Sequence, residues 1–127
     1  MLNTTITGKD SSALLSVSVS GGPCFIRPED IIRLEASSNY TYFHFINRKP
    51  LLAARVLRDY ELLLEGYGFL RVHRSHLVNR KHIRGIDNNG QIILPGDYRP
   101  EISRRKRKKV LEALQASSSH SVLLQRS

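Results

Sequence analysis

Several features that would place a protein in a particular class are missing from this sequence. Cys24 is the only cysteine, so the chain cannot form an internal disulfide, and we expect a reducing, cytoplasmic setting. No stretch approaches the roughly 18 apolar residues that a membrane span needs. The N-terminus has no basic stretch followed by an apolar run, as a secretory signal would. The sequence therefore predicts a soluble protein that is not exported and has no membrane partner.

Acidic residues are also scarce relative to basic ones. The chain has 11 Asp and Glu against 20 Lys and Arg, which gives a formal charge of +9. Most of the excess lies in two segments: residues 71–84 contain five cations and no acid, and residues 99–109 contain seven cations and one acid, Glu101. A single basic run is often only a solvated face, whereas two such runs favour binding to a polyanion.

The length of 127 residues and the ordinary balance of 40% hydrophobic and 24% charged residues predict one globular domain. Residues 1–12 are polar and unpatterned, which indicates a disordered end or a stub of linker. Residues 115–127 have the composition of a loosely ordered tail. We therefore assign the domain to residues 13–114.

The hydrophobic pattern within this domain predicts short antiparallel strands and two helices. Val56, Leu57, Tyr60, Leu63 and Leu64 recur with a helical period, which predicts an amphipathic helix at about 55–65 that covers one face of a sheet. Ser103 is a plausible N-cap for a basic helix at about 103–114. Turn signals, including Asp87-Asn88-Asn89-Gly90, separate the strands expected at 14–19, 25–26, 31–35, 40–46, 51–54, 69–72, 83–86, 91–94 and 98–102. The fold class is mainly β.

Three histidines in ten residues, His73, His76 and His82, raise the possibility of a metal site or a hydrolase. On an extended chain, however, His73 and His76 point to opposite faces, and no cysteine or carboxylate lies near them in sequence. Ser75 could complete a Ser-His-Asp set only without the nucleophile-elbow sequence that such sites have. We therefore expect no enzyme, no metal, no other cofactor and no small-molecule substrate.

Binding to nucleic acid uses the same residues better. The planar fork of Arg74 can donate to guanine O6 and N7 together, while Ser75, Asn79, Arg80 and Lys81 suit phosphate oxygens. Asn79 can equally be a turn or cap residue, and His73 can be a half-buried histidine. A helix over 103–114 would turn cations outward on neighbouring sides, namely Arg104, Arg105, Arg107, Lys108 and Lys109, with Val110, Leu111 and Leu114 facing inward.

Four segments taken in order resemble the LytTR family of bacterial DNA-binding domains, over about residues 26–114. The segments are IIRLEASSNYTYFHF at 31–45, FLRVHRSHLVN at 69–79, HIRGI at 82–86 and EISRRKRKKV at 101–110. Members of this family are transcription regulators, usually with the domain at the C-terminus of a two-component response regulator. The resemblance implies an elongated stack of small antiparallel β-sheets. No receiver domain precedes the match in this sequence, so the chain is expected to be a stand-alone regulator or a fragment without phosphotransfer chemistry.

The resemblance also implies that loops, and not a recognition helix, reach base edges in successive major grooves. The first loop is Ser37 to Thr41, with Thr41 facing the bases and Asn39 or Tyr40 beside it. Arg74, flanked by His73 and Ser75, holds the second loop. Arg105, which follows Ser103 and Arg104, holds the third. The residues expected to contact phosphates or to support the interface are Asn39, Tyr40, His73, Ser75, Asn79, Arg80, Lys81, Ser103, Arg104, Lys106, Arg107, Lys108 and Lys109.

Our leading hypothesis is sequence-specific binding to double-stranded DNA for transcription regulation, with two copies of the chain on paired short repeats. The alternative is a basic adaptor that binds acidic protein or lipid surfaces. A third hypothesis, a histidine-dependent hydrolase or metalloenzyme, predicts bound metal or an activity that His73→Ala abolishes.

Overall fold

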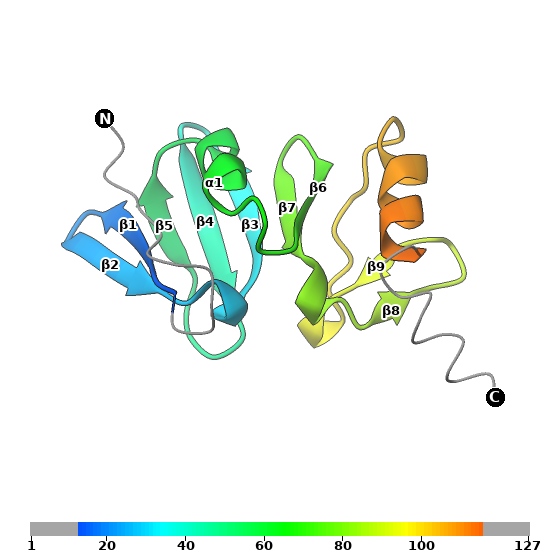
Figure 1. Ribbon diagram of the computed structural model, residues 1–127, viewed down its shortest axis with the longest axis horizontal. Helices are drawn as coiled ribbons and strands as arrows, with labels where there is room; N and C mark the ends of the chain where they lie inside the picture. Colours follow the sequence, from blue (N-terminus) through cyan, green and yellow to red (C-terminus); the bar gives the residue numbers. More distant parts are fainter. Residues whose placement is uncertain (1–12, 116–127) are drawn as a thin grey trace.

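Three small antiparallel sheets follow one another along the long axis of the molecule (Figure 1). This computed structural model describes residues 13–115, so our expectations for residues 1–12 and 116–127 lie outside the described residues. The first sheet pairs β1 (Leu15–Val19) with β2 (Gly22–Ile26), and the third pairs β8 (Gly85–Ile86) with β9 (Ile92–Ile93). The predicted mainly β fold, an elongated stack of small sheets, is confirmed.

The central sheet has five strands in the order β5-β4-β3-β7-β6. Its strands are β3 (Ile31–Ser37), β4 (Tyr40–Phe45), β5 (Leu51–Ala54), β6 (Phe69–His73) and β7 (His76–Asn79). Leu34 of β3 pairs with Phe43 on one side and Leu77 on the other, and all three are buried, so one face of this sheet carries the first core. The sequence patterns did not predict β7.

Helix α1 (Leu57–Leu63) closes this core, and it is two residues shorter at each end than predicted. Leu57, Tyr60 and Leu64 are buried, as their helical spacing predicted. The ring of Tyr60 packs edge-on against Phe43 with 4.9 Å between centroids, and its hydroxyl donates to the Ala54 carbonyl. The helix therefore covers a sheet face, which confirms its predicted role.

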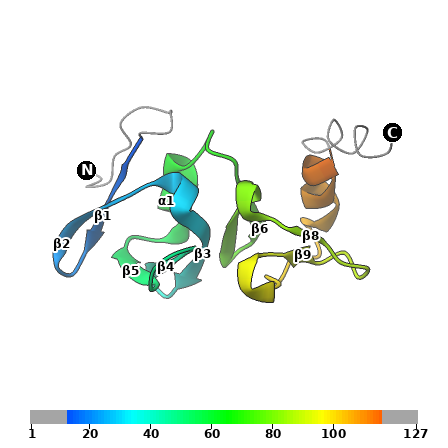
Figure 2. The same cartoon turned by 90° about the horizontal axis from the view of Figure 1, so that it is seen from below.

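A second core joins the β6–β7 hairpin to the C-terminal part of the chain. Its buried residues are Val72, Val78, Ile92, Leu94 and Val110. The helix that supplies Val110 covers residues 107–115, beginning four residues later than predicted and including residue 115 of the expected tail. Both helices lie on one side of the strands in the view from below (Figure 2).

The late start of the C-terminal helix has a structural cause. The Ser103 N–H donates to the Val72 carbonyl at 2.8 Å, so the chain is still attached to β6 at this point. A turn follows at residues 104–106, and the helical residues begin after it.

Short 3-10 helices complete the fold: η1 (Pro28–Asp30), η2 (Arg80–His82) and η3 (Pro95–Asp97). Of the strand expected at 98–102, only a bridge between Leu94 and Tyr98 forms. Within residues 13–115, no helix is long and apolar enough to cross a membrane.

Candidate nucleic-acid interface

Three connections between elements lie along one long edge of the molecule, the upper edge in Figure 1. They are the β3–β4 turn, the β6–β7 turn and the segment that precedes the C-terminal helix. We call this the turn edge and define it as residues 38–40, 74–75 and 101–106. These are the three places that the family resemblance assigns to DNA contact, and they come together because β3 and β6 run toward the same edge.

The second connection is a tight hairpin turn. His73 pairs directly with His76, which leaves Arg74 and Ser75 as the two turn residues, and the Arg74 side chain is exposed. The Ser75 N–H donates to His73 Nδ1 at 3.0 Å, and the Ala36 N–H donates to the Ser75 carbonyl at 2.9 Å. The backbone of Ser75 is therefore held by its neighbours at both its N–H and its carbonyl, while the Arg74 side chain is exposed at the edge.

This hairpin contradicts our placement of His73 and His76 on opposite faces. The chain reverses between them, so the two rings lie on one face with centroids 5.3 Å apart. His73 Nε2 also lies 3.6 Å from Glu101 Oε1, which links the second connection to the third. Among residues 13–115, no group of three or more His, Cys, Asp and Glu side chains is arranged to hold a metal ion.

The second and third connections share one hollow. Its volume is about 810 Å³, and it is lined by His73, Arg74, Glu101, Ser103, Arg104, Arg105 and Lys106. Arg104 and Arg105 are exposed, as Arg74 is. The hydrogen bond from Ser103 to Val72 fixes the segment against β6. The two arginines predicted to contact bases, Arg74 and Arg105, are thus presented at one concave surface.

Thr41 does not belong to this surface, and the prediction that it faces the bases is wrong. Its side chain is fully buried, and its hydroxyl donates to the Arg55 carbonyl at 3.0 Å. The physical reason is strand alternation, because Thr41 lies on the same face of β4 as the buried Phe43. At the first connection the exposed side chains are those of Ser38, Asn39 and Tyr40.

Asn79 is also buried, so its predicted contact with phosphate is wrong. Its amide Nδ2 donates to the Ile31 carbonyl at 2.9 Å and to the Pro28 carbonyl at 3.4 Å, and its Oδ1 accepts from the Lys81 N–H at 3.0 Å. The alternative assignment of Asn79 as a cap residue is correct, because it caps η2. A buried amide in this position connects β7, η1 and η2.

Arg80 and Lys81 follow Asn79 at the far end of β7 from the turn edge (Figure 1). Arg80 is half-buried, and its Nη2 donates to the Ala113 carbonyl at 2.9 Å. It therefore attaches η2 to the C-terminal helix. Lys81 is exposed at the same end. The strand thus separates these two cations from Arg74, although all three belong to one basic run in the sequence.

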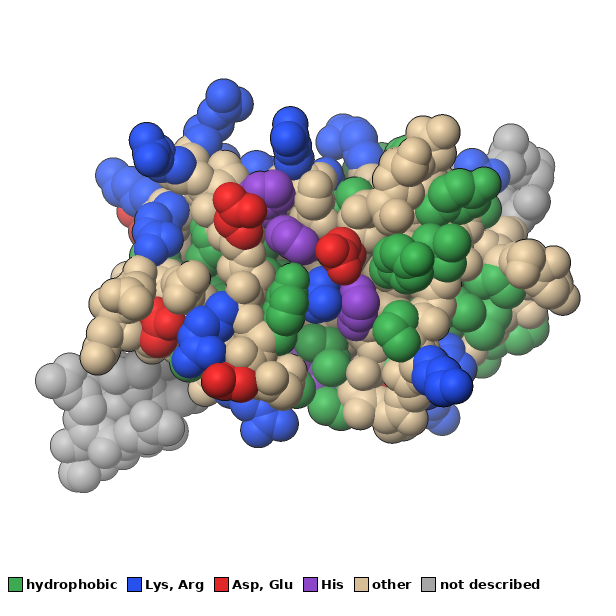
Figure 3. Space-filling view, turned by 180° about the vertical axis from the view of Figure 1, so that it is seen from behind, with side chains coloured by type: hydrophobic (Ala, Val, Ile, Leu, Met, Phe, Trp, Pro, Cys, Tyr) green, Lys and Arg blue, Asp and Glu red, His purple; other side chains and the backbone are tan. Residues whose placement is uncertain are grey.

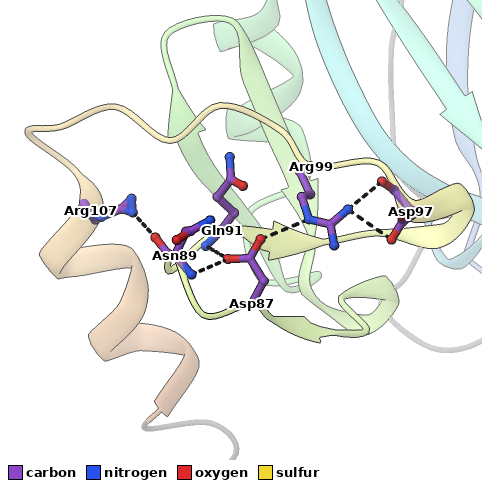
Figure 4. Close-up of polar contacts among 6 residues, drawn as sticks. All are labelled: Asp87, Asn89, Gln91, Asp97, Arg99 and Arg107. Carbon is purple, nitrogen blue, oxygen red and sulfur yellow. Dashed lines mark hydrogen bonds and ion pairs between the residues drawn. The ribbon is translucent and has the colours of Figure 1, made fainter.

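Two cations of the C-terminal basic run hold the β8–β9 turn (Figure 4). Arg99 Nε donates to Asp87 Oδ2 at 3.0 Å and its Nη1 lies 3.0 Å from Asp97 Oδ1. Arg107 donates to the Asn89 carbonyl at 2.7 Å. The N–H of Gln91 and then the Arg99 guanidinium hold the pKa of Asp87 below its ordinary value. Arg107 thus attaches the C-terminal helix to the β8–β9 turn, and the exposed cations that remain in this run are Arg104, Arg105, Lys108 and Lys109.

The back of the central sheet has a different character (Figure 3). Lys and Arg side chains project from the upper edge of this view, whereas the middle carries histidine, acidic and hydrophobic side chains. Glu35 Oε1 accepts from Arg33 at 3.2 Å and from His44 at 3.0 Å. Burial alone would raise the pKa of Glu35, but the hydrogen bond from His44 and the charge of Arg33 lower it. Arg33 also stacks on Tyr98 at 3.8 Å, so its guanidinium is engaged within the protein.

Comparison with known proteins identifies the family and the fold. The family model of the LytTr DNA-binding domain matches residues 22–115. A similar solved structure is the LytTr DNA-binding domain of a protein assigned as a methyl-accepting/DNA response regulator in Bacillus cereus. It is 23% identical in sequence with a TM-score of 0.64, and the match covers 84% of this chain and 97% of that one, which shows a shared fold. None of the curated proteins matches the sequence.

Proposed function

The chain belongs to the LytTr family of DNA-binding domains, which bind DNA in transcription regulation, and on this premise we propose that it binds duplex DNA sequence-specifically through the turn edge. The observation that carries the proposal is the shared hollow, at which Arg74 and Arg105 are presented from two separate connections. Neither guanidinium has a carboxylate within ion-pair distance among the described residues. Both are therefore available to a ligand outside the protein.

Arg74 and Arg105 take the role of base contacts in this proposal. A guanidinium can donate two parallel hydrogen bonds to guanine O6 and N7 in the major groove, which a point charge cannot do. At the first connection, Tyr40 and Asn39 replace Thr41 as candidates, since Tyr40 is 50% exposed at the start of β4. The three connections would then meet bases at successive positions along the duplex.

The remaining exposed cations of this edge take the role of phosphate contacts. Arg104 precedes the C-terminal helix, and Lys108 and Lys109 lie in its first turn. Contacts with phosphate fix the protein on the duplex without distinguishing sequences. We include in the proposal that two copies of the chain occupy paired short repeats, each through its own turn edge.

The test begins by selecting binding sites from a random duplex library with the purified protein. Arg74→Ala and Arg105→Ala should each weaken binding to the selected site by about 1–3 kcal/mol, with a smaller effect on scrambled DNA. Lys108→Ala should weaken both duplexes by the same factor. Equal losses on both duplexes for Arg74→Ala and Lys108→Ala would contradict the division of roles.

Vesicle binding separates this function from the adaptor alternative. The protein is mixed with anionic phospholipid vesicles at the same ionic strength as the DNA titration, and co-sedimentation is measured. We expect binding to the selected duplex to be much tighter than binding to vesicles. Comparable affinity for vesicles and for the selected duplex would favour the basic adaptor.

A further inference from the structure

Arg71 lies beneath the β6–β7 turn, and all three nitrogens of its guanidinium donate hydrogen bonds there. Nε donates to the His73 carbonyl at 2.9 Å, and Nη2 donates to the Arg74 carbonyl at 2.6 Å. Nη1 donates to Glu61 Oε1 of α1 at 2.6 Å. The side chains of Arg71 and Glu61 are 18% and 33% exposed. Arg71 thus joins the backbone of Arg74 directly to helix α1.

The strand pairing explains why the turn needs this support. The register between β6 and β7 is irregular between Arg71 and His73, so the regular ladder is interrupted just before the turn. The ladder is therefore incomplete beside the turn, and hydrogen bonds from side chains contribute to holding it. Arg71 donates hydrogen bonds to the carbonyls of His73 and Arg74, which lie between this irregularity and the end of the turn. These two bonds act on the Arg74 side of the turn, whereas the bonds from Ser75 to His73 and from Ala36 to Ser75 hold the other residue.

The charge of Arg71 is paired within the protein, which leaves its hydrogen-bond geometry as its contribution. Arg71 belongs to the basic run 71–84, which in the sequence suggests a phosphate contact. In the structure its charge is paired with the Glu61 carboxylate. Glu61 is therefore separated only by the Arg71 guanidinium from the β6–β7 turn, which is the part of the turn edge proposed to contact DNA. Coulomb repulsion between Glu61 and DNA can only weaken binding. The Arg71–Glu61 pair can therefore favour DNA binding only by holding Arg74 in position, and not through its charge.

We propose that Arg71, oriented by Glu61, is a positioning residue that fixes Arg74 for base recognition, so that α1 contributes to sequence specificity without touching DNA. This inference rests on the proposed function, because it assumes that Arg74 contacts bases. It predicts that the fork geometry of Arg71 matters and its charge does not. A lysine at position 71 would keep the charge but could not bond to both carbonyls and Glu61 in the same planar arrangement.

The decisive variant is Glu61→Gln, because the two explanations predict different results for the affinity ratio. Removing a negative charge near the interface should strengthen binding to every duplex if only electrostatics matters. If Glu61 orients Arg71, the same change weakens a charge-assisted hydrogen bond to a neutral one, and it should lower the ratio of selected-site to scrambled-site affinity by roughly 2- to 10-fold. Glu65→Gln is the matched control, since it makes the same charge change at an exposed residue just beyond α1. It should leave the ratio unchanged.

Arg71→Lys and a double variant complete the test, with thermal melts to confirm that each protein is folded at the assay temperature. Arg71→Lys should lower the affinity ratio as Glu61→Gln does, with the salt dependence unchanged. In the Arg74→Ala background, Glu61→Gln should change the ratio by less than about twofold, because the group that it positions is gone. A Glu61→Gln protein that behaves like Glu65→Gln, or an Arg71→Lys protein with the wild-type ratio, would overturn the inference.

The Arg74→Ala protein alone separates this inference from the proposed function. If Arg74→Ala lowers the affinity ratio and Glu61→Gln does not, Arg74 contacts bases but is not positioned by the pair. If Arg74→Ala weakens both duplexes equally, the base-contact role of Arg74 fails, and the inference fails with it. Glu61→Gln could also lower the ratio of selected-site to scrambled-site affinity by the same factor in the wild-type and Arg74→Ala backgrounds. That result would show a general effect on the fold and would overturn the inference.

Discussion

Replacing Asn79 with alanine should destabilise the fold and leave the DNA affinity of the folded protein unchanged. The Asn79 side chain is 1% exposed and makes two hydrogen bonds of good length, to the Ile31 carbonyl and from the Lys81 N–H. Its third bond, to the Pro28 carbonyl, is long at 3.4 Å. Each of the two good bonds contributes about 1 kcal/mol, and buried partners left unpaired add to the loss. We therefore expect the free energy of unfolding to fall by about 2–4 kcal/mol.

For a domain of this size, that loss corresponds to a fall of roughly 10–20 °C in melting temperature. The measurement is a thermal melt followed by circular dichroism, with a DNA titration well below the melting temperature of the variant. Lys81→Ala is the control: it changes an exposed neighbour, and should alter neither the melting temperature nor the affinity appreciably. An Asn79→Ala protein with wild-type melting and a shallower salt dependence of binding would refute this reasoning, because it would indicate a contact with phosphate.

Three further predictions concern salt, the first connection and pH. We expect four to six cations of the turn edge and the adjoining helix to contact phosphates, and each contact contributes about 0.9 to the salt dependence of binding. The slope of log affinity against log salt should therefore lie between about −3.5 and −5.5. A slope near zero in a salt titration would contradict the interface. Thr41→Val should cost about 1 kcal/mol in a denaturant melt through the lost bond to Arg55, and an altered sequence preference would contradict its burial. Burial chiefly lowers the pKa values of His44 and His76 below their ordinary 6.5, so the unfolded chain binds protons first and stability should decrease as pH falls below about 6.5. Melting temperatures measured at pH 7.5 and 5.5 test this sign, and a more stable protein at pH 5.5 would contradict it.

The sequence patterns predicted those elements whose local signals agree with their final environment. The change of period at Val56 indicated α1, because that helix buries one side against a sheet. The Asn-Gly pair before Gln91 indicated the β8–β9 hairpin, and Gly90 does adopt a positive φ of 78° there. A Cβ at Gly90 would also lie 3.1 Å from Arg107 Nη2, so a larger residue there would require the Arg107 guanidinium to shift.

The β6–β7 hairpin could not be predicted from local signals. Its turn residues, Arg74 and Ser75, include none of the glycine, asparagine or proline that usually mark a chain reversal. The turn is held by bonds from Arg71 and by the Ser75–His73 bond, and arginine and histidine at these positions are not among the usual signals of a turn. For the same reason the basic run 71–84 looked like one surface, whereas β7 places Arg80 and Lys81 at the end opposite Arg74.

Thr41 illustrates a different limit. The alternation of β4 already placed it on the face of Phe43 and Phe45, which the structure buries. The family resemblance instead assigned it to the bases, because position in a motif does not report the direction of a side chain. Burial of the hydroxyl against Arg55 transfers the candidate role to Tyr40 and Asn39.

Contact of Arg74 and Arg105 with separate bases can be tested by combining each arginine substitution with changes to single bases and measuring whether the two losses of affinity are additive. Each guanine of the selected site is replaced in turn by 7-deazaguanine, which lacks the N7 acceptor, and affinity is measured for wild type, Arg74→Ala and Arg105→Ala. We expect one position at which the base analogue weakens binding of wild type but not of Arg74→Ala, and a different position at which it weakens binding of wild type but not of Arg105→Ala. Analogue effects that are the same in all three proteins at every guanine would contradict it.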